Sequence, residues 1–145
     1  SGTSIDFTSI PSWAKRITVM FSGVSTSGGS AVIVQLGSGG FTTTGYASSG
    51  NNAASGNGWT IANFTTGLTT SYDSDAARTR YGFMQIVNVG GNVWVSSCVL
   101  GNSASTSMSV AAGGITLAGA LDRVRITTVN GTDTFDAGSI NILYE

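Results

Sequence analysis

Apolar and polar side chains alternate along many short segments of the chain, which are separated by Gly, Ser, Asn and Thr. In Arg16–Phe21, the side chains of Ile17, Val19 and Phe21 fall on one side of an extended backbone. The strands that this pattern predicts are Ser4–Thr8, Arg16–Phe21, Ala31–Leu36, Phe41–Tyr46, Trp59–Phe64, Tyr81–Val89, Val93–Leu100, Ile115–Leu121, Arg123–Val129 and Ser139–Tyr144. Because no segment shows a helical period with a cap, the sequence predicts an all-β fold.

Glycine and asparagine mark the connections between the predicted strands. Gly90–Asn92 predicts a tight hairpin, and Asn130 followed by Gly131 predicts a second one, because this pair readily adopts the positive φ angles of a two-residue turn. The longest polar stretch, Ser48–Gly58, holds too few apolar side chains to form a core strand. We expect it to be a surface loop, which is where binding residues often lie.

The number of strands indicates the architecture. About ten short strands in one chain of 145 residues are typical of a β-sandwich or a β-barrel. An immunoglobulin-like sandwich commonly has fewer strands and a Cys…Trp…Cys spacing, whereas this chain has 1 Cys. We therefore expect residues 1–145 to form a single domain, a β-sandwich of the jelly-roll kind.

Charged residues are scarce in this sequence. They make up 9% of the chain, and 6 Lys and Arg against 7 Asp and Glu leave a formal net charge of −1. Roughly 25% charged residues is usual for a globular domain. The basic residues form three separated pairs, Lys15/Arg16, Arg78/Arg80 and Arg123/Arg125. Nucleic-acid binding needs a basic surface, and a membrane-spanning helix needs about 20 apolar residues in a row. We therefore expect neither nucleic-acid binding nor insertion into a membrane.

The absence of His and the single Cys argue against most kinds of catalysis. Cys98 lies in an apolar strand and has no His to act as its base, so we expect a buried core residue. Asp73 and Asp75 are the best catalytic alternative, since two nearby carboxylates suffice for glycoside hydrolysis, and their oxygens also suit calcium. A solvated turn explains the pair more simply. We therefore expect no enzyme, no catalytic residue, no metal site and no cofactor.

Aromatic residues divide into two groups according to their surroundings. Phe83 and Trp94 lie in apolar strands, so we expect both to pack in the core. Other aromatic residues flank the segments rich in Gly and Asn, which places them near the expected surface loop. The receptor-contact candidates are the aromatic residues Tyr46, Trp59 and Tyr72 together with Asn51 and Asn52 of the expected loop.

The low charge also has an explanation in assembly. Interfaces between identical subunits are depleted in Lys, Glu and Asp, and association hides sheet edges that are prone to aggregation. The composition therefore favours a compact homo-oligomer.

Both ends of the chain resemble one known family of domains. The matching segments are Gly2–Pro11 (GTSIDFTSIP), Lys15–Ser25 (KRITVMFSGVS) and Leu121–Glu145 (LDRVRITTVNGTDTFDAGSINILYE). They are similar to the domain found at the distal end of bacteriophage tail fibres and tail needles. The segments cover under half of the chain but bracket all of it, and the middle from about Gly37 to Thr79 is not matched to the family.

The resemblance implies a trimeric knob with a jelly-roll fold of the tumour-necrosis-factor type, mounted on a fibrous stalk. This chain would then be the C-terminal knob alone, which also fits a start at Ser1 without Met. The implied location is the virion tail tip, on the extracellular side, and the implied role is host attachment or assistance in genome delivery. The implied partners are two further copies of the chain and a host cell-surface polysaccharide or outer-membrane protein.

In a trimer of this kind, we expect contacts between subunits near the end of the chain. Ile140, Ile142 and Tyr144 alternate along the final strand and face either the core or the threefold interface, and Arg123 or Arg125 meets an acidic group across it. Two other classes of function stay open. One is a sugar-binding β-sandwich without a viral role, and the other is a glycosidase that uses an Asp pair.

Overall fold

The computed structural model describes residues 2–54, 57–72, 75–103 and 107–145, and leaves out the side chains of residues 57–59. Within these ranges the chain forms strands and no helix. The strands are β1 (Ser4–Thr8), β2 (Arg16–Thr26), β3 (Val32–Ser38), β4 (Gly40–Phe41), β5 (Ala47–Ala54), β6 (Asn57–Phe64), β7 (Leu68–Thr69), β8 (Thr79–Gly90), β9 (Val93–Ser103), β10 (Ser107–Thr116), β11 (Arg123–Thr128) and β12 (Phe135–Tyr144). The predicted all-β fold is confirmed.

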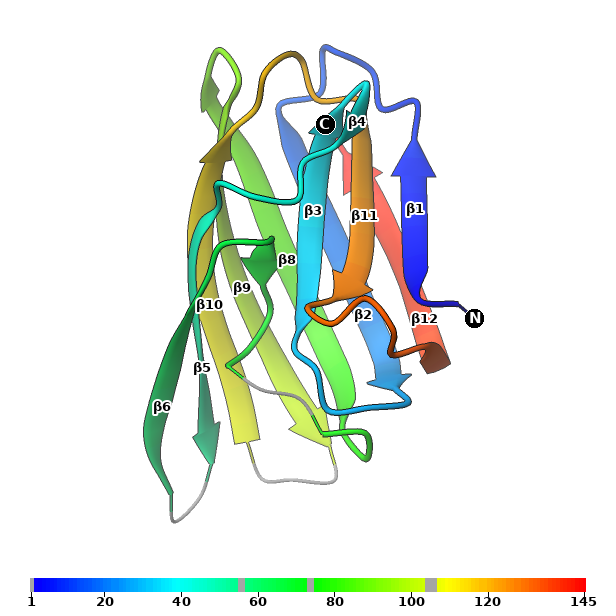
Figure 1. Ribbon diagram of the computed structural model, residues 1–145, viewed down its shortest axis with the longest axis vertical. Coiled ribbons are helices and arrows are strands. Elements are labelled where there is room, and N and C mark those ends of the chain that lie inside the picture. The colour runs from blue at the N-terminus through cyan, green and yellow to red at the C-terminus, as the bar shows by residue number, and fades with distance from the viewer. Residues whose placement is uncertain (1, 55–56, 73–74, 104–106) are drawn as a thin grey trace.

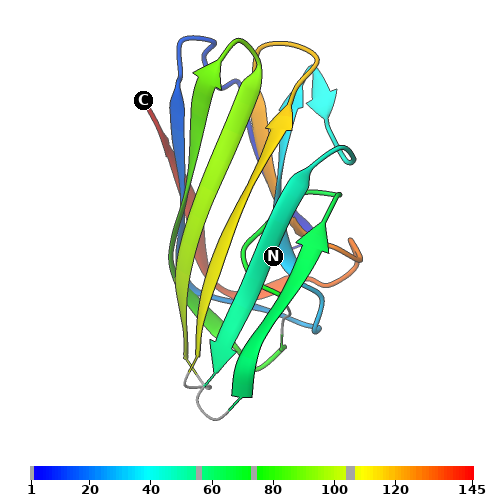
Figure 2. The same ribbon diagram turned by 90° about the vertical axis from the view of Figure 1, so that its left-hand side faces the viewer.

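The strands form two antiparallel sheets that lie face to face (Figures 1 and 2). The smaller sheet has the order β1-β11-β3-β4, with β7 also paired to β3. The larger sheet has the order β12-β2-β8-β9-β10-β5-β6, and the hairpin β5–β6 forms one of its edges. The predicted β-sandwich is therefore confirmed, while the jelly-roll connectivity and the trimer stay predictions.

Alternate side chains from both sheets form the core between them. Ile17, Val19 and Phe21 of β2 point inward, and each is at most 3% exposed. Val124 and Ile126 join the same apolar cluster from β11 of the smaller sheet. Because burying one such side chain contributes about 1.5–3 kcal/mol, the alternation predicted from the sequence supplies the main driving force for the sandwich.

The segment Ser48–Gly58 is not the surface loop that its composition predicts. Its residues form most of β5 and the start of β6, and β5 pairs with β10 along its whole length. The small inward residues have a steric reason, because a Cβ at Gly50 would lie 2.7 Å from the Thr69 side chain. The Ser48 hydroxyl accepts a hydrogen bond from the backbone N–H of Thr69 at 2.9 Å. Polar residues therefore hold β5 against β7, where a core strand usually has aliphatic ones.

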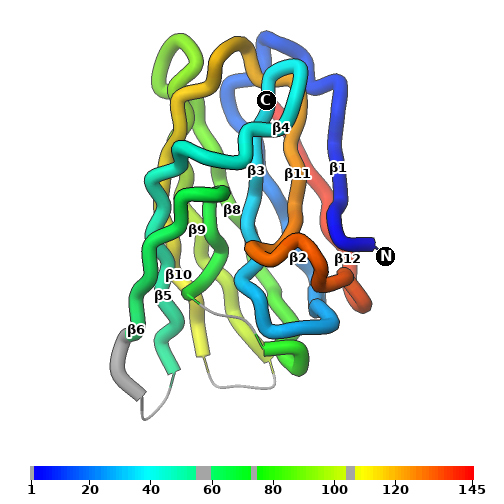
Figure 3. Tube along the Cα trace, in the orientation of Figure 1, coloured from blue at the N-terminus to red at the C-terminus, as the bar shows by residue number. Residues whose placement is uncertain are grey.

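The two predicted hairpins differ in outcome. Gly90–Asn92 joins β8 to β9 as predicted, with φ angles of 137° at Gly90 and 53° at Gly91. The pair at 130–131 does not connect a hairpin, because β11 and β12 belong to different sheets. Gly131 still turns the chain, with φ of 68° and a hydrogen bond to the Thr128 carbonyl, at the start of the crossing visible in Figure 3.

Two predicted strands lie largely outside the sheets. Of Phe41–Tyr46, only Phe41 belongs to a strand, and β10 ends at Thr116 instead of continuing to 121. Leu117 and Leu121 are nevertheless buried, at 3% and 4% exposure. Apolar residues of this connection cover the end of the core, which explains why the pattern resembled a strand.

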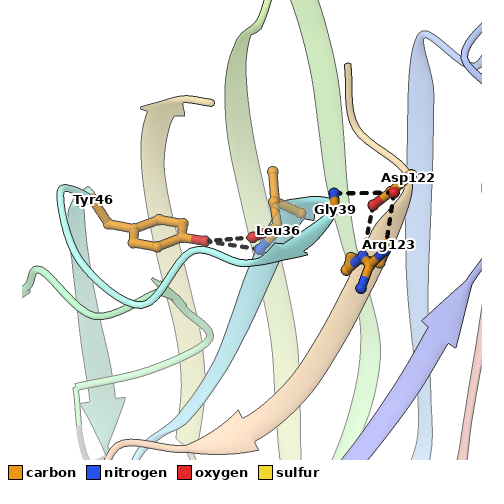
Figure 4. Close-up of polar contacts among 5 residues, drawn as sticks. All are labelled: Leu36, Gly39, Tyr46, Asp122 and Arg123. Atoms are coloured by element: carbon orange, nitrogen blue, oxygen red, sulfur yellow. Dashed lines mark hydrogen bonds and ion pairs between the residues drawn. The ribbon is translucent and has the colours of Figure 1, made fainter. Parts of the chain in front are cut away.

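Tyr46 is an anchor between a connection and the smaller sheet. Its hydroxyl accepts a hydrogen bond from the Leu36 N–H at 2.8 Å (Figure 4) and donates one to the Thr42 carbonyl at 2.9 Å. Burial raises the pKa of the Tyr46 hydroxyl to about 12, although the hydrogen bond from the Leu36 backbone opposes the rise. The side chain thus satisfies a buried backbone group that has no strand partner at this point.

Replacement of this hydroxyl tests the anchor. Tyr46→Phe leaves the Leu36 N–H buried without an acceptor, so we expect the free energy of unfolding to fall by about 1–3 kcal/mol. Urea denaturation followed by circular dichroism measures the change, and Tyr72→Phe at the exposed Tyr72 serves as control. Equal midpoints for Tyr46→Phe and the unaltered chain would contradict this role.

Candidate functional site

The outer face of the larger sheet carries a row of apolar side chains across its strands. Met20 of β2, Phe83 of β8, Val99 of β9 and Val110 of β10 are successive register partners. Their exposures are 38%, 53%, 46% and 43%, so all four point away from the core. Register partners lie about 5 Å apart, which makes the row continuous across four strands.

Further apolar side chains extend this row. Tyr81 and Met108 lie one step along the strands, both paired with Gly101 between them, and are 51% and 52% exposed. Ile61 of β6 continues the first row beyond Asn51 and is 65% exposed. We call the set the outer apolar face; its members are Met20, Ile61, Tyr81, Phe83, Val99, Met108 and Val110.

Charge is missing from the middle of this sheet. Among the described residues of β5, β6, β8, β9 and β10, the one charged residue is Arg80, whose side chain is buried. The guanidinium of Arg80 points inward and donates to the Val24 carbonyl at 3.4 Å. A molecule that covered the outer apolar face would therefore not have to remove water from a charged group, which is normally the costly part of burying a surface.

A shallow depression interrupts the face where β10, β5 and β6 meet. It encloses about 210 Å³ and is lined by Ser49, Gly50, Asn51, Ile61, Val110, Ala111 and Ala112. The small side chains on β5 and β10 leave this space between the larger Ile61 and Val110. The outer apolar face thus has projecting side chains on β8 and a hollow near β6.

Three of the predicted receptor contacts are not exposed, which corrects our expectation. Tyr46 is 3% exposed for the reason given above, and Asn51 and Asn52 are 8% exposed. Asn51 lies between Ile61 and Val110, and its side-chain oxygen accepts a hydrogen bond from the Val110 N–H at 3.1 Å. Asn51 and Asn52 belong to a paired strand where the sequence predicted a loop, and Tyr46, which flanks that segment, is buried as an anchor.

The two remaining receptor-contact candidates stay predictions. Tyr72 follows β7 and is 36% exposed. Trp59 belongs to β6, and its side chain lies outside the described part of the structure.

Phe83 is the clearest functional candidate that sequence reasoning missed. We expected it to pack in the core, as Trp94 does at 3% exposure, but Phe83 is 53% exposed. The sequence held an indication of this, because Phe83 and Met84 are consecutive large apolar residues of one strand and so must point to opposite faces of the sheet. Strands that are apolar on both faces are typical of sheets that are covered on both sides.

The predicted interface arginines find their acidic partners within the same chain. Arg125 donates two hydrogen bonds to Asp6, at 2.7 and 2.8 Å, and its guanidinium lies 4.1 Å from the centre of the Phe41 ring. Arg123 pairs with Asp122 at 2.7 Å, and Asp122 also accepts from the Gly39 N–H (Figure 4). Neither arginine needs a second chain for its ion pair, and contact with another copy stays a prediction.

Two of the three residues named in the final strand follow the core alternative of our expectation, and Tyr144 does not. Ile140 and Ile142 are partly buried and pack against the core of their own chain. Tyr144 is 39% exposed, and its ring centre lies 5.8 Å from that of Trp13. A trimer contact at these residues is not required by their environment.

Cys98 and Asp75, two of the residues considered for catalysis or metal binding, have contacts that fit a structural role. Cys98 is 1% exposed and burial raises the pKa of its thiol to about 12, which confirms the expected core role. Asp75 accepts a hydrogen bond from the Ala77 N–H at 3.0 Å, and Asp73 lies outside the described residues. Within the described ranges, no group of three His, Cys, Asp or Glu side chains could hold a metal ion, and no helix could cross a membrane.

Comparisons with models of protein families, with curated proteins and with solved structures found no match to this chain.

Titration tests the ion pair that joins β1 to β11. The hydrogen bond from Arg125 lowers the pKa of Asp6, and burial partly opposes it. A carboxyl with a lowered pKa in the folded state stabilises the protein above its unfolded pKa, and this stability is lost as the pH falls through the folded value. We therefore expect Asp6→Asn to weaken the acid-side decline of the melting temperature below about pH 4.

Arg125→Gln provides the matched control, because it removes the same pair from the other side. In thermal melts between about pH 6 and pH 2, the double variant is expected to behave like Arg125→Gln, which also removes the contact of the guanidinium with the Phe41 ring. Additive losses in the double variant would show that Asp6 and Arg125 act separately.

Proposed function

We propose that this chain is a non-enzymatic knob that assembles as a homotrimer at the tip of a bacteriophage tail fibre or tail needle. The knob contacts the host cell surface during attachment or genome delivery. The observation that carries the proposal is the outer apolar face, a large uncharged surface on a chain of low charge. The resemblance of both chain ends to distal knob domains supports the same assignment.

The physical properties of the surface suit an assembly of several copies. Interface centres are apolar and poor in charged residues, and the middle of the larger sheet has this composition. Three copies on one axis also present three binding surfaces at once. Weak individual contacts with a polysaccharide or membrane protein then add up through effective concentration.

The mass of the chain in solution is the first test of this proposal. Light scattering is expected to give three times the chain mass, independent of dilution through the micromolar range. A stable monomer would contradict the trimer and would favour the sugar-binding module without a viral role.

Cell binding tests the adhesive role. The fluorescently labelled chain is expected to bind some strains of a bacterial panel, and matched strains that lack surface polysaccharide distinguish the two receptor classes. Binding to no strain of the panel would overturn the adhesive role. Release of reducing sugar from the polysaccharide, abolished by Asp75→Asn, would instead support the glycosidase.

A further inference from the structure

The outer apolar face offers two features of complementary shape on one sheet. Phe83 projects from β8, and the depression lined by Asn51, Ile61 and Val110 lies toward the other edge of the sheet. β8 and β5 are three places apart in the strand order, so the two features are separated by roughly 14 Å. A chain cannot fill its own depression with its own Phe83 at this distance.

We propose that the outer apolar face packs against the same face of a second copy, with Phe83 of one copy seated in the depression of the next. The inference rests on the proposed function, because it names which surface the assembled copies share. It differs from the sequence expectation, which placed the contacts at the two arginines and the final strand.

The size of the face supports a second copy as its occupant. Its seven side chains are 38% to 65% exposed. Because a large side chain has roughly 150–250 Å² of surface, this exposure amounts to about 600 Å² of apolar area. The largest apolar patch of a typical monomer is about 300–600 Å² and is often functional, so this face lies at the upper end of that range. A stable interface buries about 800 Å² on each partner. The neighbouring polar row of Gln85 and Ser97 can supply the remaining area.

Charge distinguishes a second copy from other occupants. Nucleic acids and anionic membranes require basic residues, and the strands at the centre of this face expose none among the described residues. Arg16 is the first residue of β2 and is neutralised by Glu145 at 2.7 Å. Two copies of an uncharged face neither repel one another nor bury an unpaired charge.

The shape also determines the type of contact. If two copies seated Phe83 in each other's depression, the contact would be isologous and would give a dimer. Because Phe83 and the depression occupy different parts of the face, a copy can instead seat its Phe83 in one neighbour and receive the Phe83 of another in its depression. Contacts of this heterologous kind form a closed ring when the rotation between copies closes. A ring of three copies around the outer apolar face is compatible with the proposed trimer.

Disulfide trapping tests the seating of Phe83. In the double variant Phe83→Cys/Ile61→Cys, the two positions lie four strands apart in one chain, roughly 19 Å, which is too far for an internal disulfide. Mild oxidation is expected to link chains into covalent dimers and trimers on a non-reducing gel. Native Cys98 does not interfere, because it is buried and its thiol pKa is about 12.

Two controls complete the trapping experiment. Phe83→Cys/Thr8→Cys, with the second cysteine on the smaller sheet, is expected to stay in single chains. Efficient cross-linking of Phe83→Cys alone would show two Phe83 positions facing each other, and would overturn the seating in the depression.

A charge on the face tests the interface without cross-linking. Phe83→Asp is expected to reduce the mass in solution to that of one chain at concentrations where the unaltered protein assembles. Val129→Asp changes another exposed apolar residue, 44% exposed and away from the face, and is expected to leave the mass unchanged. Circular dichroism establishes that both variants remain folded.

The outcomes separate this inference from the proposed function. A trimer that survives Phe83→Asp and forms no disulfide would overturn the interface and leave the adhesive knob standing. Cross-linked chains that bind no bacterial cell would overturn the adhesive role and leave the interface standing. A monomeric chain that sediments with phosphatidylcholine vesicles would overturn the interface and make the face a lipid-binding surface.

Discussion

The larger sheet is apolar on both faces, and the smaller sheet covers only one of them. Inward Met84 and Ile86 are fully buried, while Phe83 between Met20 and Val99 is exposed on the opposite side. The cost of leaving such a surface in water scales with its area. The covered face forms the core of the sandwich, and the uncovered apolar face, which is poor in charge, is the surface that we propose to be buried by assembly.

Polar contacts also hold the sandwich together. The Tyr46 hydroxyl satisfies the backbone of Leu36, and the Ser48 hydroxyl satisfies that of Thr69. The ion pair of Asp6 and Arg125 joins β1 to β11 on the smaller sheet. None of these three contacts involves a side chain of the outer apolar face.

Local patterning predicted much of the fold but little of the candidate site. The alternation in β2 was sufficient to locate a strand and its inward face, because Ile17 lies between the polar residues Arg16 and Thr18. β5 was missed because its stability depends on backbone pairing with β10 and on hydroxyl contacts with β7, neither of which is a local property. The partner of Tyr46 likewise depends on the path of the chain.

The outward position of Phe83 shows a second limit. Period-two patterning tells which residues share a face, but a strand that is apolar on both sides gives no indication of which side the second sheet covers. The pairing of Arg125 with Asp6 spans 119 residues and was likewise beyond local reasoning. In both cases the missing information was the arrangement of distant segments.

Methionine oxidation tests the central claim, that the outer apolar face is covered in the assembled protein. Met20 and Met108 are 38% and 52% exposed in a single chain, while Met84 is fully buried. Peptide mass spectrometry after brief treatment with hydrogen peroxide compares the three residues in one sample. The account predicts that Met20 and Met108 are protected to nearly the same degree as Met84 in the assembled protein and oxidise readily in Phe83→Asp. Rapid oxidation of both residues in the assembled, unaltered protein would contradict it.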